Sequence, residues 1–143
     1  MTLADLRALP LLAGLNDMDL ARLRTHLAWS WHQPGERLLE PGQLCTDFFI
    51  IAGGQVEIVL PGEIATRLAL LGPGDFFGER AALTGEPAPT AAVALEVTTT
   101  LRLTAEGFLL LLEAGGEPVR RIIAGLSARA GEAAERLHRT RLR

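Results

Sequence analysis

The segment Gly72–Val93 reads GPGDFFGERAALTGEPAPTAAV, and the rest of the chain can be understood around it. Its first four residues form a turn rich in glycine and proline, two phenylalanines follow, and residues 78–83 can make one or two turns of helix. A short helix that begins with glycine and small side chains leaves its first backbone N–H groups uncovered, and such a helix start can receive an anion. The local pattern alone favours a plainer interpretation, a tight crossover between two strands in which the glycines serve only the backbone geometry. Both interpretations stay open at this point.

The composition indicates one globular domain. The 143 residues are 48% hydrophobic and 22% charged, which is enough apolar material for a substantial core. The net charge of −3 argues against a general nucleic-acid binder, although residues 117–143 carry seven arginines against three glutamates, or +4, and residues 1–116 therefore carry −7. The chain has no lysine, so every fixed cation is an arginine.

The cysteine and histidine content argues against disulfides and metal sites. The single Cys45 permits no internal disulfide and fits a reducing compartment, so we expect a cytoplasmic protein. The histidines His26, His32 and His138 are scattered and have no metal-ligand spacing, so we expect no metal and no cofactor. The most apolar run, Phe108–Leu112, is far too short to cross a bilayer, and no membrane association is expected.

Residues 1–28 read as a helical lead-in. Leucines at positions 3, 6 and 9 share a face of a predicted helix over Thr2–Leu9, which Pro10 closes. A second helix is predicted to begin at Asn16 or Asp17, because both residue types are good N-caps and acidic residues follow in the first turn.

Residues 29–103 consist of short segments in which apolar and polar residues alternate, a pattern that is typical of β-strands. Trp29 and Trp31 alternate with polar neighbours, and Pro-Gly or Gly-Gly turns recur roughly every 8–12 residues, which indicates an all-β sandwich or barrel. Besides the strand at Trp29–His32, we expect strands at Arg37–Glu40, Cys45–Ala52, Gln55–Leu60, Ala65–Leu71, Ala91–Val97 and Thr99–Leu103.

Residues 104–143 are predicted to be helical again. Thr104 is a candidate N-cap for a helix over Ala105–Glu113, which Gly115-Gly116 should end. Pro118 suits the first position of a last helix. One face of that helix carries an apolar stripe, which can pack on its own domain or on a second copy, so residues 117–140 are a candidate homodimer interface. The stripe consists of Val119, Ile122, Ile123, Leu126, Ala130, Ala133 and Leu137.

Together these features resemble the cyclic nucleotide-binding domain, the module shared by bacterial cAMP-receptor transcription factors, cAMP-dependent kinase regulatory subunits and cyclic nucleotide-gated channels. The resemblance includes the segment Gly72–Glu79 (GPGDFFGE), runs from about Leu6 to Leu137 and is most specific from Leu70 to Glu86. It implies a mostly β fold, a jelly-roll-like β-roll with flanking N-terminal and C-terminal helices. It also implies one domain with three parts, a lead-in at 1–28, a β-roll at 29–103 with a phosphate-binding cassette at 72–93, and closing helices at 104–143.

The resemblance further implies how a cyclic nucleotide such as cAMP or cGMP would be held. Gly78 and the amides that follow it would face the cyclic phosphate, and Glu79 would accept a hydrogen bond from the ribose 2′-hydroxyl. The two phenylalanines before Gly78 are expected to belong to the core rather than to stack on a base. The base would be closed over by the last helix, where Ser127 and Arg121 are weak candidates. The candidate ligand-binding residues are Phe77, Gly78, Glu79, Arg80, Ala81, Ala82, Pro89, Thr90 and Ala91.

The chain departs from the family pattern at one position. The family places an arginine about ten residues after the cassette glutamate, where it pairs with the phosphate, and this chain has Pro89. No arginine lies between Arg80 and Arg102. An arginine–phosphate contact contributes roughly 1.5–3 kcal/mol, or about ten- to more than a hundredfold in affinity. Thr90 and the Ala91 amide remain as neutral donors. Glu79 has an alternative role that needs no ligand, because a glutamate in the first turn of a helix satisfies the backbone amides and the helix dipole there. Arg80 is expected to be a surface residue.

Three hypotheses about function follow. The first is a regulatory sensor that binds a cyclic nucleotide or a related small anion and signals through its C-terminal helices. The second is a degenerate domain that serves as a dimerisation or protein-interaction module without a cyclic nucleotide ligand. The third, an enzyme of the cupin type, is disfavoured because no cluster of histidine and carboxylate ligands is visible, so we expect a non-enzyme. The sequence stops at Arg143, so unless it is a fragment of a longer chain we expect no helix-turn-helix after the long helix and no direct DNA recognition.

Overall fold

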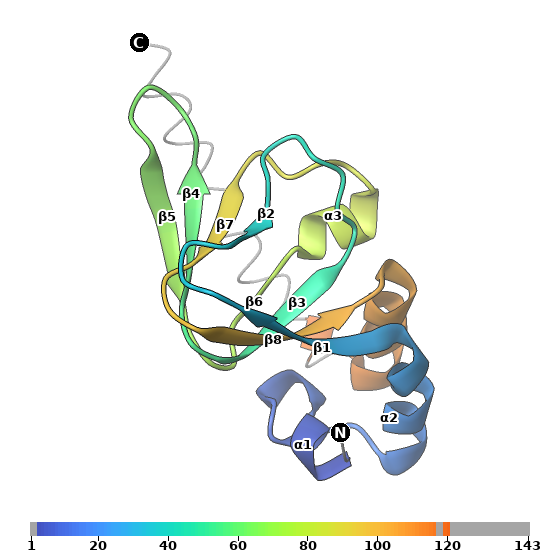
Figure 1. Cartoon of the computed structure of the whole chain (residues 1–143). Coiled ribbons are helices and arrows are strands. Elements are labelled where there is room, and N and C mark those ends of the chain that lie inside the picture. The colour runs from blue at the N-terminus through green and yellow to red at the C-terminus, as the bar shows by residue number, and fades with distance from the viewer. Residues whose placement is uncertain (1–2, 117–118, 121–143) are drawn as a thin grey trace.

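The structure, a computed structural model, describes residues 3–116, 119 and 120. The N-terminal part is helical, as predicted (Figure 1). Its elements are α1 (Leu3–Arg7), the 3-10 turn η1 (Pro10–Leu12), α2 (Asp17–Leu23) and η2 (Arg24–His26). The Asn16 side chain caps α2 by accepting a hydrogen bond from the Asp19 amide at 2.8 Å, which confirms the predicted helix start.

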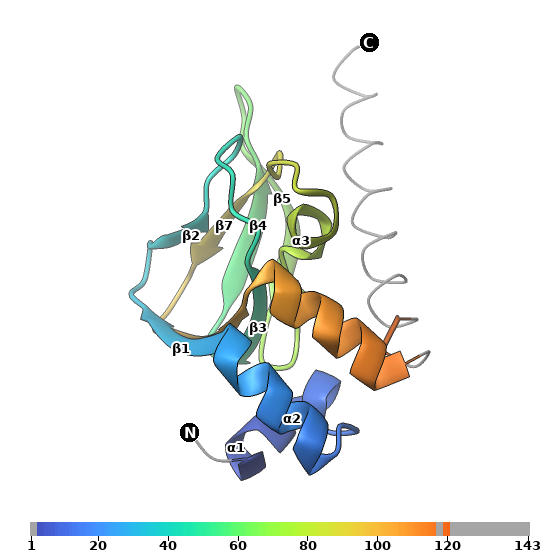
Figure 2. The ribbon, with the colours of Figure 1, turned by 90° about the vertical axis from the view of Figure 1, so that its right-hand side faces the viewer.

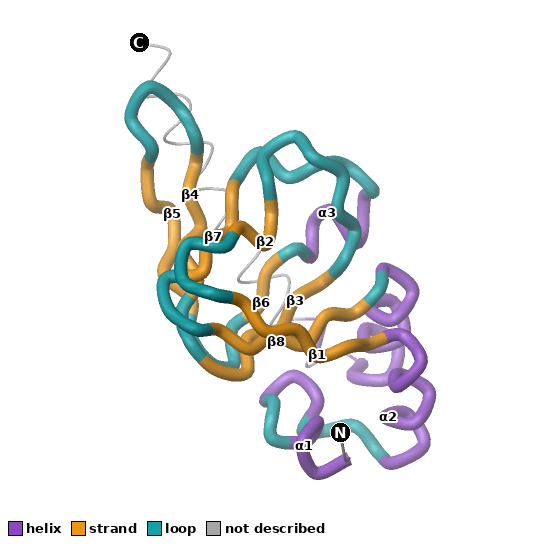
Figure 3. The backbone as a smooth tube through the Cα atoms, viewed as in Figure 1, coloured by secondary structure: helices purple, strands orange, loops and turns teal. Residues whose placement is uncertain are grey.

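Eight strands form two antiparallel four-stranded sheets (Figure 3). The first sheet has the order β1-β8-β3-β6 and the second has the order β2-β7-β4-β5. This arrangement confirms the predicted β-roll with flanking helices. The strands are β1 (Leu27–His32), β2 (Arg37–Leu39), β3 (Phe48–Gly53), β4 (Val56–Leu60), β5 (Thr66–Leu71), β6 (Phe76–Phe77), β7 (Ala91–Ala94) and β8 (Thr98–Leu103).

Strand β3 of the first sheet is buried on both faces. In β3, Phe48 and Ile50 face a cluster formed with the N-terminal leucines, whereas Phe49 and Ile51 face the inside of the roll. This division follows from the period of two in a strand. We call the first group the outer cluster and the second the inner cluster. The inner cluster contains Leu39, Phe49, Ile51, Val56, Phe77 and Ala92, with Leu38, Cys45, Ile58, Leu71 and Ala88 packed against it.

The C-terminal part begins with a helix over residues 105–116, which packs beside α2 (Figure 2). Thr104 caps it, as predicted, by accepting a hydrogen bond from the Gly107 amide at 3.0 Å. Phe108 stacks on Phe48 with ring centroids 4.4 Å apart, which fixes the helix on the outer cluster. Gly107 lies so close to η2 that a Cβ there would be 2.7 Å from the Cβ of His26.

Several predicted boundaries were wrong. The helix does not end before Gly115 but continues through residue 116, and Val119 then packs directly on Gly115, where an added Cβ would meet its Cγ2 at 2.2 Å. Strand β3 begins at Phe48, the first residue with a ladder partner on β8, rather than at Cys45. Strand β7 ends at Ala94, because the chain turns there and the Leu95 amide donates to the Gln55 carbonyl.

The predicted last helix, with the candidate dimer interface at 117–140 and the candidates Arg121 and Ser127, lies outside the described residues apart from Val119 and Arg120. Within the part of the chain that the structure describes, no helix has both the length and the apolar character needed to cross a membrane.

Candidate functional site

The site begins at Gly78, where the chain leaves β6. This glycine has a φ of 89°, in the left-handed region that other residues rarely adopt. A Cβ added to it would lie 2.6 Å from the backbone carbonyl oxygen of Asp47. Two separate constraints therefore require glycine at position 78, the backbone conformation and the close approach of the segment that enters β3.

The helix α3 (Glu79–Thr84) follows at once and packs against β3. Its first intrahelical bond runs from the Ala82 amide to the Gly78 carbonyl at 3.2 Å, so the amides of residues 79–81 lie at the open end of the helix. Ala81 and Ala82 are buried, because their small side chains let the helix lie close to the sheet. At the other end Gly85 adopts a φ of 73°, and its amide donates to the Ala81 carbonyl at 2.8 Å.

The two charged residues of the cassette have different surroundings. Glu79, at the first position of α3, is half-buried, whereas Arg80 is exposed. The backbone carbonyl of Arg80 accepts a hydrogen bond from the Thr84 hydroxyl at 2.8 Å. The exposure of Arg80 agrees with the surface role expected for it.

The site has two arms. The first arm is Gly78–Ala82, and the second, residues 89–91, leads into β7 on the other sheet. Pro89 is exposed, Thr90 is half-buried, and Ala91 is buried as the first residue of β7, opposite Val59 of β4. The two arms meet at the inner cluster, because Phe77 precedes Gly78 on one arm and Ala92 follows Ala91 on the other. The fold therefore brings the predicted site residues into one region, although they come from different sheets. Phe77 itself is buried in that cluster, as expected for a core residue.

A neighbouring pair, Asp47 and Arg102, was missed by sequence reasoning. The Arg102 guanidinium donates to the Asp47 carboxylate at 2.6 Å and lies 5.1 Å from the centre of the Phe49 ring. Phe49 in turn stacks on Phe77 at 4.7 Å, with the rings 8° from parallel. Asp47 and Arg102 are 55 positions apart, and no local spacing signal connects them.

The arginines of the roll mostly have acidic partners. Arg37 is paired with Glu40 at 3.1 Å, and Arg67 with Glu57 at 2.9 Å. The carboxylate of Asp75, in the turn before β6, accepts a hydrogen bond from the Gly72 amide at 2.8 Å. Among the described residues, no group of three or more histidine, cysteine or acidic side chains could hold a metal ion.

One buried histidine connects the first sheet to the turn that leads to the second sheet. His32 on β1 contacts the Glu36 carboxylate through Nδ1, and its Nε2 lies 3.0 Å from the Thr100 hydroxyl on β8. The hydrogen bond from His32 lowers the pKa of Glu36 below its ordinary value. This contact fixes the turn from β1 to β2, the crossing from one sheet to the other.

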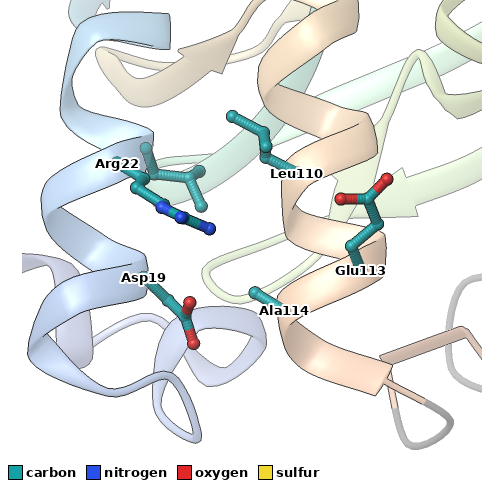
Figure 4. A pocket seen from close by; sticks show the side chains of 6 residues that line it. Asp19, Arg22, Leu110, Glu113 and Ala114 are labelled. Atoms are coloured by element: carbon teal, nitrogen blue, oxygen red, sulfur yellow. The ribbon is translucent and has the colours of Figure 1, made fainter.

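Two cavities lie outside the cassette. One, of about 350 Å³, is lined mainly by polar residues at the start of β1 and the end of β8, including Asp47 and Arg102. The other, of about 190 Å³, lies between α2 and the helix of residues 105–116 (Figure 4). In Figure 4, Arg22 of α2 extends toward the side of the facing helix that carries Leu110 and Ala114. Neither cavity is lined by residues 76–91.

The comparison with known families settles the identity of the fold. A family model described as the cyclic nucleotide-binding domain matches residues 30–114, which is more than half of the chain. The chain belongs to this family. The match spans both sheets, the cassette and most of the helix of residues 105–116, so the cyclic nucleotide-binding domain accounts for the structure described above.

Individual relatives agree with this assignment. The cyclic AMP receptor protein of Thermus thermophilus is 32% identical over 106 residues, covering 72% of this chain and 49% of that protein. A regulatory subunit of a cAMP-independent protein kinase A from Trypanosoma brucei superposes with a TM-score of 0.78 at 22% identity, covering 94% of this chain and 49% of the other. The corresponding subunit from Trypanosoma cruzi, solved with guanosine bound, gives 0.73 at 23% identity, with 85% and 44% covered. This chain spans at most about half the length of these relatives.

Proposed function

We propose that this chain is a ligand-sensing regulatory domain. A nucleotide or a related small molecule binds between Gly78–Ala82 and Pro89–Ala91, and its arrival changes how the C-terminal helical part packs on the roll. The single observation that carries this proposal is the geometry of Gly78, which is held in a left-handed conformation against the Asp47 carbonyl so that α3 starts beside the inner cluster. The family assignment supports the choice of this site.

The proposed roles follow from the chemistry of the side chains. The Glu79 carboxylate accepts hydrogen bonds and is therefore suited to the hydroxyl groups of a ribose. The half-buried Thr90 supplies a neutral hydroxyl on the opposite arm. Pro89 supplies neither a positive charge nor a backbone N–H, so a phosphate in this site lacks a contact that contributes roughly 1.5–3 kcal/mol.

The path of the signal is proposed to run through three aromatic rings. Phe76, two residues before Gly78, lies 5.5 Å from Phe48, and Phe48 stacks on Phe108 at 4.4 Å. Phe108 belongs to the helix of residues 105–116. A shift of β6 and α3 on ligand binding would therefore displace that helix through contacts between side chains that are nearly fully buried.

One observation favours a second candidate function. The exposed Pro89 removes the charge that a cyclic phosphate needs, so the fold also suits a degenerate domain that serves only in dimerisation or protein interaction. The homodimer through residues 117–140, the cytoplasmic location and the absence of direct DNA binding stay predictions.

Calorimetric titration combined with thermal unfolding tests the sensor function. We would titrate the purified chain with cAMP, cGMP, adenosine and guanosine, each up to millimolar concentration. Guanosine is included because it is bound in the structurally similar T. cruzi subunit. The sensor function predicts saturable heat with at least one of these compounds and a midpoint of unfolding that rises with its concentration. If all four compounds give neither heat nor stabilisation, the degenerate interaction module replaces the sensor.

A further inference from the structure

We propose that the roll contains a second ligand site, for a small uncharged polyol such as a monosaccharide, in the cavity of about 350 Å³ beside η2, the start of β1 and the end of β8. This site is separate from the cassette, because none of residues 76–91 lines the cavity. The proposal therefore does not depend on what the cassette binds. It is carried by the polar inner face of β1 and β8, by the charge balance of the cavity and by the hydrogen-bonding groups that line it.

The inner face of the β1–β8 pair is polar, in contrast to the rest of the roll. On β8, Arg102 and Thr100 lie opposite Phe49 and Ile51 of β3, whose side chains face the inner cluster. Because residues directly opposite one another in an antiparallel ladder face the same side, their partners on β1 also point inward. No residue of β1 or β8 belongs to the inner cluster. The inward residues are Ala28, Ser30 and His32 of β1 with Thr98, Thr100 and Arg102 of β8.

One half of this polar strip is filled by the protein itself. His32, Thr98 and Thr100 are the buried polar residues in the part of the chain that the structure describes. The His32 ring contacts the Thr100 hydroxyl, and the Thr98 hydroxyl donates to the backbone carbonyl of Glu96 at 2.8 Å. These groups therefore satisfy one another without a ligand.

The other half of the strip is open. The inward residues of β1 at this end are Ala28 and Ser30, whose side chains are too small to fill the space in front of Arg102, and the cavity lies there. Its volume lies within the range of roughly 300–1,000 Å³ that is usual for small-molecule sites. The sequence of β1 therefore produces a polar cavity where a larger apolar residue would have extended the core.

The charges that line the cavity cancel each other. The Arg102 guanidinium donates to the Asp47 carboxylate at 2.6 Å. A ligand with a net charge would compete with one member of this pair for the other and would leave the displaced group without its partner. The carboxylate of Glu106, 3.8 Å from Nδ1 of His26, adds negative charge beside the cavity and further disfavours an anion. An uncharged ligand can bind while the ion pair stays intact.

The lining groups match a ligand that carries several hydroxyls. Asp47 can only accept hydrogen bonds and Arg102 can only donate them, so two neighbouring ligand hydroxyls can donate to the first and accept from the second. The lining hydroxyls and the imidazole can both donate and accept. Six of the nine residues that line the cavity are polar, namely Thr25, His26, Ser30, Asp47, Arg102 and Thr104.

Two of these residues have hydrogen-bonding capacity left for a ligand. The bond to Asp47 uses one of the five N–H donors of Arg102, and the guanidinium makes no other hydrogen bond within the described residues. The Ser30 hydroxyl likewise has no hydrogen-bond partner in the described part of the chain. Both side chains are partly exposed, so a polyol would replace bound water with hydroxyls of the same kind.

Two-dimensional NMR of the ¹⁵N-labelled chain tests the proposal. We would titrate it with D-glucose, D-galactose and myo-inositol, and use sodium acetate and glycine as an anionic and a zwitterionic probe. We expect at least one polyol to give saturable shifts at the amides of Ser30 and Arg102, with a millimolar dissociation constant or a tighter one. The amides of Ala81 and Thr90 in the cassette should move much less.

Matched variants separate the cavity from the rest of the sheet. Ser30→Ala removes one hydroxyl from the cavity and should weaken binding of the polyol about three- to tenfold. Asp47→Asn removes the charged acceptor and should weaken it about tenfold or more. Thr99→Val is the control, because Thr99 lies opposite Trp31 on the other face of the sheet, and its replacement also removes one hydroxyl. It should leave the affinity nearly unchanged, with circular dichroism showing that each variant is folded.

Each outcome bears on the proposal. Binding of a polyol that Ser30→Ala weakens and Thr99→Val does not weaken supports the site. The proposal is overturned if no polyol shifts the amides around the cavity, if acetate or glycine binds there more tightly than every polyol, or if both hydroxyl variants lose affinity equally. Shifts confined to Gly78–Ala82 would also overturn it, while supporting the cassette as a ligand site, so the two proposals can fail separately.

Discussion

Arg102 of β8 and Asp47, just before β3, form an ion pair at 2.6 Å next to Gly78, the residue before α3. The Asp47 carbonyl oxygen lies against Gly78, and the same guanidinium lies over Phe49, which stacks on Phe77. Arg102 is therefore connected to two consecutive residues of the cassette by two separate routes. The pair is partly exposed, with 40% of the Arg102 side chain and 32% of the Asp47 side chain accessible, so its effect on the position of the cassette should exceed its effect on stability.

Arg102→Gln should weaken ligand binding at Gly78–Ala82 while lowering the free energy of unfolding by only about 1 kcal/mol, from the loss of one partly exposed ion pair and one cation–π contact. Chemical denaturation measures the stability, and calorimetric titration with the ligand that binds measures the affinity. Arg67→Gln is the matched control, because it removes the 2.9 Å pair with Glu57 on the other sheet. An equal loss of affinity in both variants would show that Arg102 has no special connection to the cassette.

Gly78→Ala should be strongly destabilising. Alanine in the left-handed region costs about 1–2 kcal/mol, and the contact with the Asp47 carbonyl adds a backbone clash that costs roughly 1–3 kcal/mol more. Gly85→Ala provides the matched control, because Gly85 has a φ of 73° but nothing within 4 Å of an added Cβ. Urea denaturation should therefore show a clearly larger loss for Gly78→Ala than for Gly85→Ala. Equal losses would mean that the close approach of Asp47 contributes nothing.

Phe108→Leu should separate ligand binding from its effect on the C-terminal part. Leucine keeps an apolar side chain in the outer cluster but removes the stack on Phe48, at a cost of about 1–2 kcal/mol in stability from the lost ring contact and the smaller volume. The affinity for the ligand should stay within a few-fold of the wild-type value. Ligand-induced changes in amide hydrogen exchange over residues 105–116 should shrink. Unchanged exchange effects would exclude the aromatic path through Phe48.

The contact between His32 and Glu36 predicts a pH dependence of stability. Because the folded-state pKa of Glu36 is lowered from its ordinary value of 4.5, this carboxylate contributes stability that is fully present above that value and is lost as the pH falls through the folded-state pKa. The stability difference between the wild-type chain and Glu36→Gln should therefore be greatest above pH 4.5 and shrink in more acidic solution. Unfolding midpoints of both proteins from pH 3 to pH 7 measure it, and a constant difference across that range would contradict the prediction.

The elements that could be predicted from the sequence are those specified by local chemistry. Asn16 and Thr104 are capping residues that act on amides three positions away, and both caps are present as expected. The alternation in the strands, together with the glycine- and proline-rich turns, indicated an all-β sandwich or barrel, and the resemblance to the cyclic nucleotide-binding domain specified the roll. The segment at Gly78 was recognisable from its resemblance to the family's phosphate-binding cassette, and the structure adds the left-handed φ of 89° that favours glycine there.

What could not be predicted depends on contacts between distant segments. Nothing near Arg102 in the sequence indicates a partner at Asp47, and nothing near His32 indicates that Thr100 will lie beside its second ring nitrogen. The strand limits at Phe48 and Ala94 depend on where a neighbouring strand begins and ends, which residue propensities do not encode. The helix of residues 105–116 passes through Gly115 despite the low helix propensity of glycine, because Phe108 and Leu111 of this helix are buried in the outer cluster.

The opposite orientations of Phe48 and Phe49 in β3 have a consequence for redesigning this protein. The inner cluster can be varied to change which molecule the roll accepts, while the outer cluster, which holds the helices, is left untouched, because neighbouring positions of one strand serve the two clusters separately. The same feature makes β3 intolerant of any change in length, since deleting one residue would exchange the two sets of side chains and disrupt both clusters together. Combinatorial libraries aimed at new ligands should therefore substitute residues on the inner face and place insertions only in the loop that precedes Asp47.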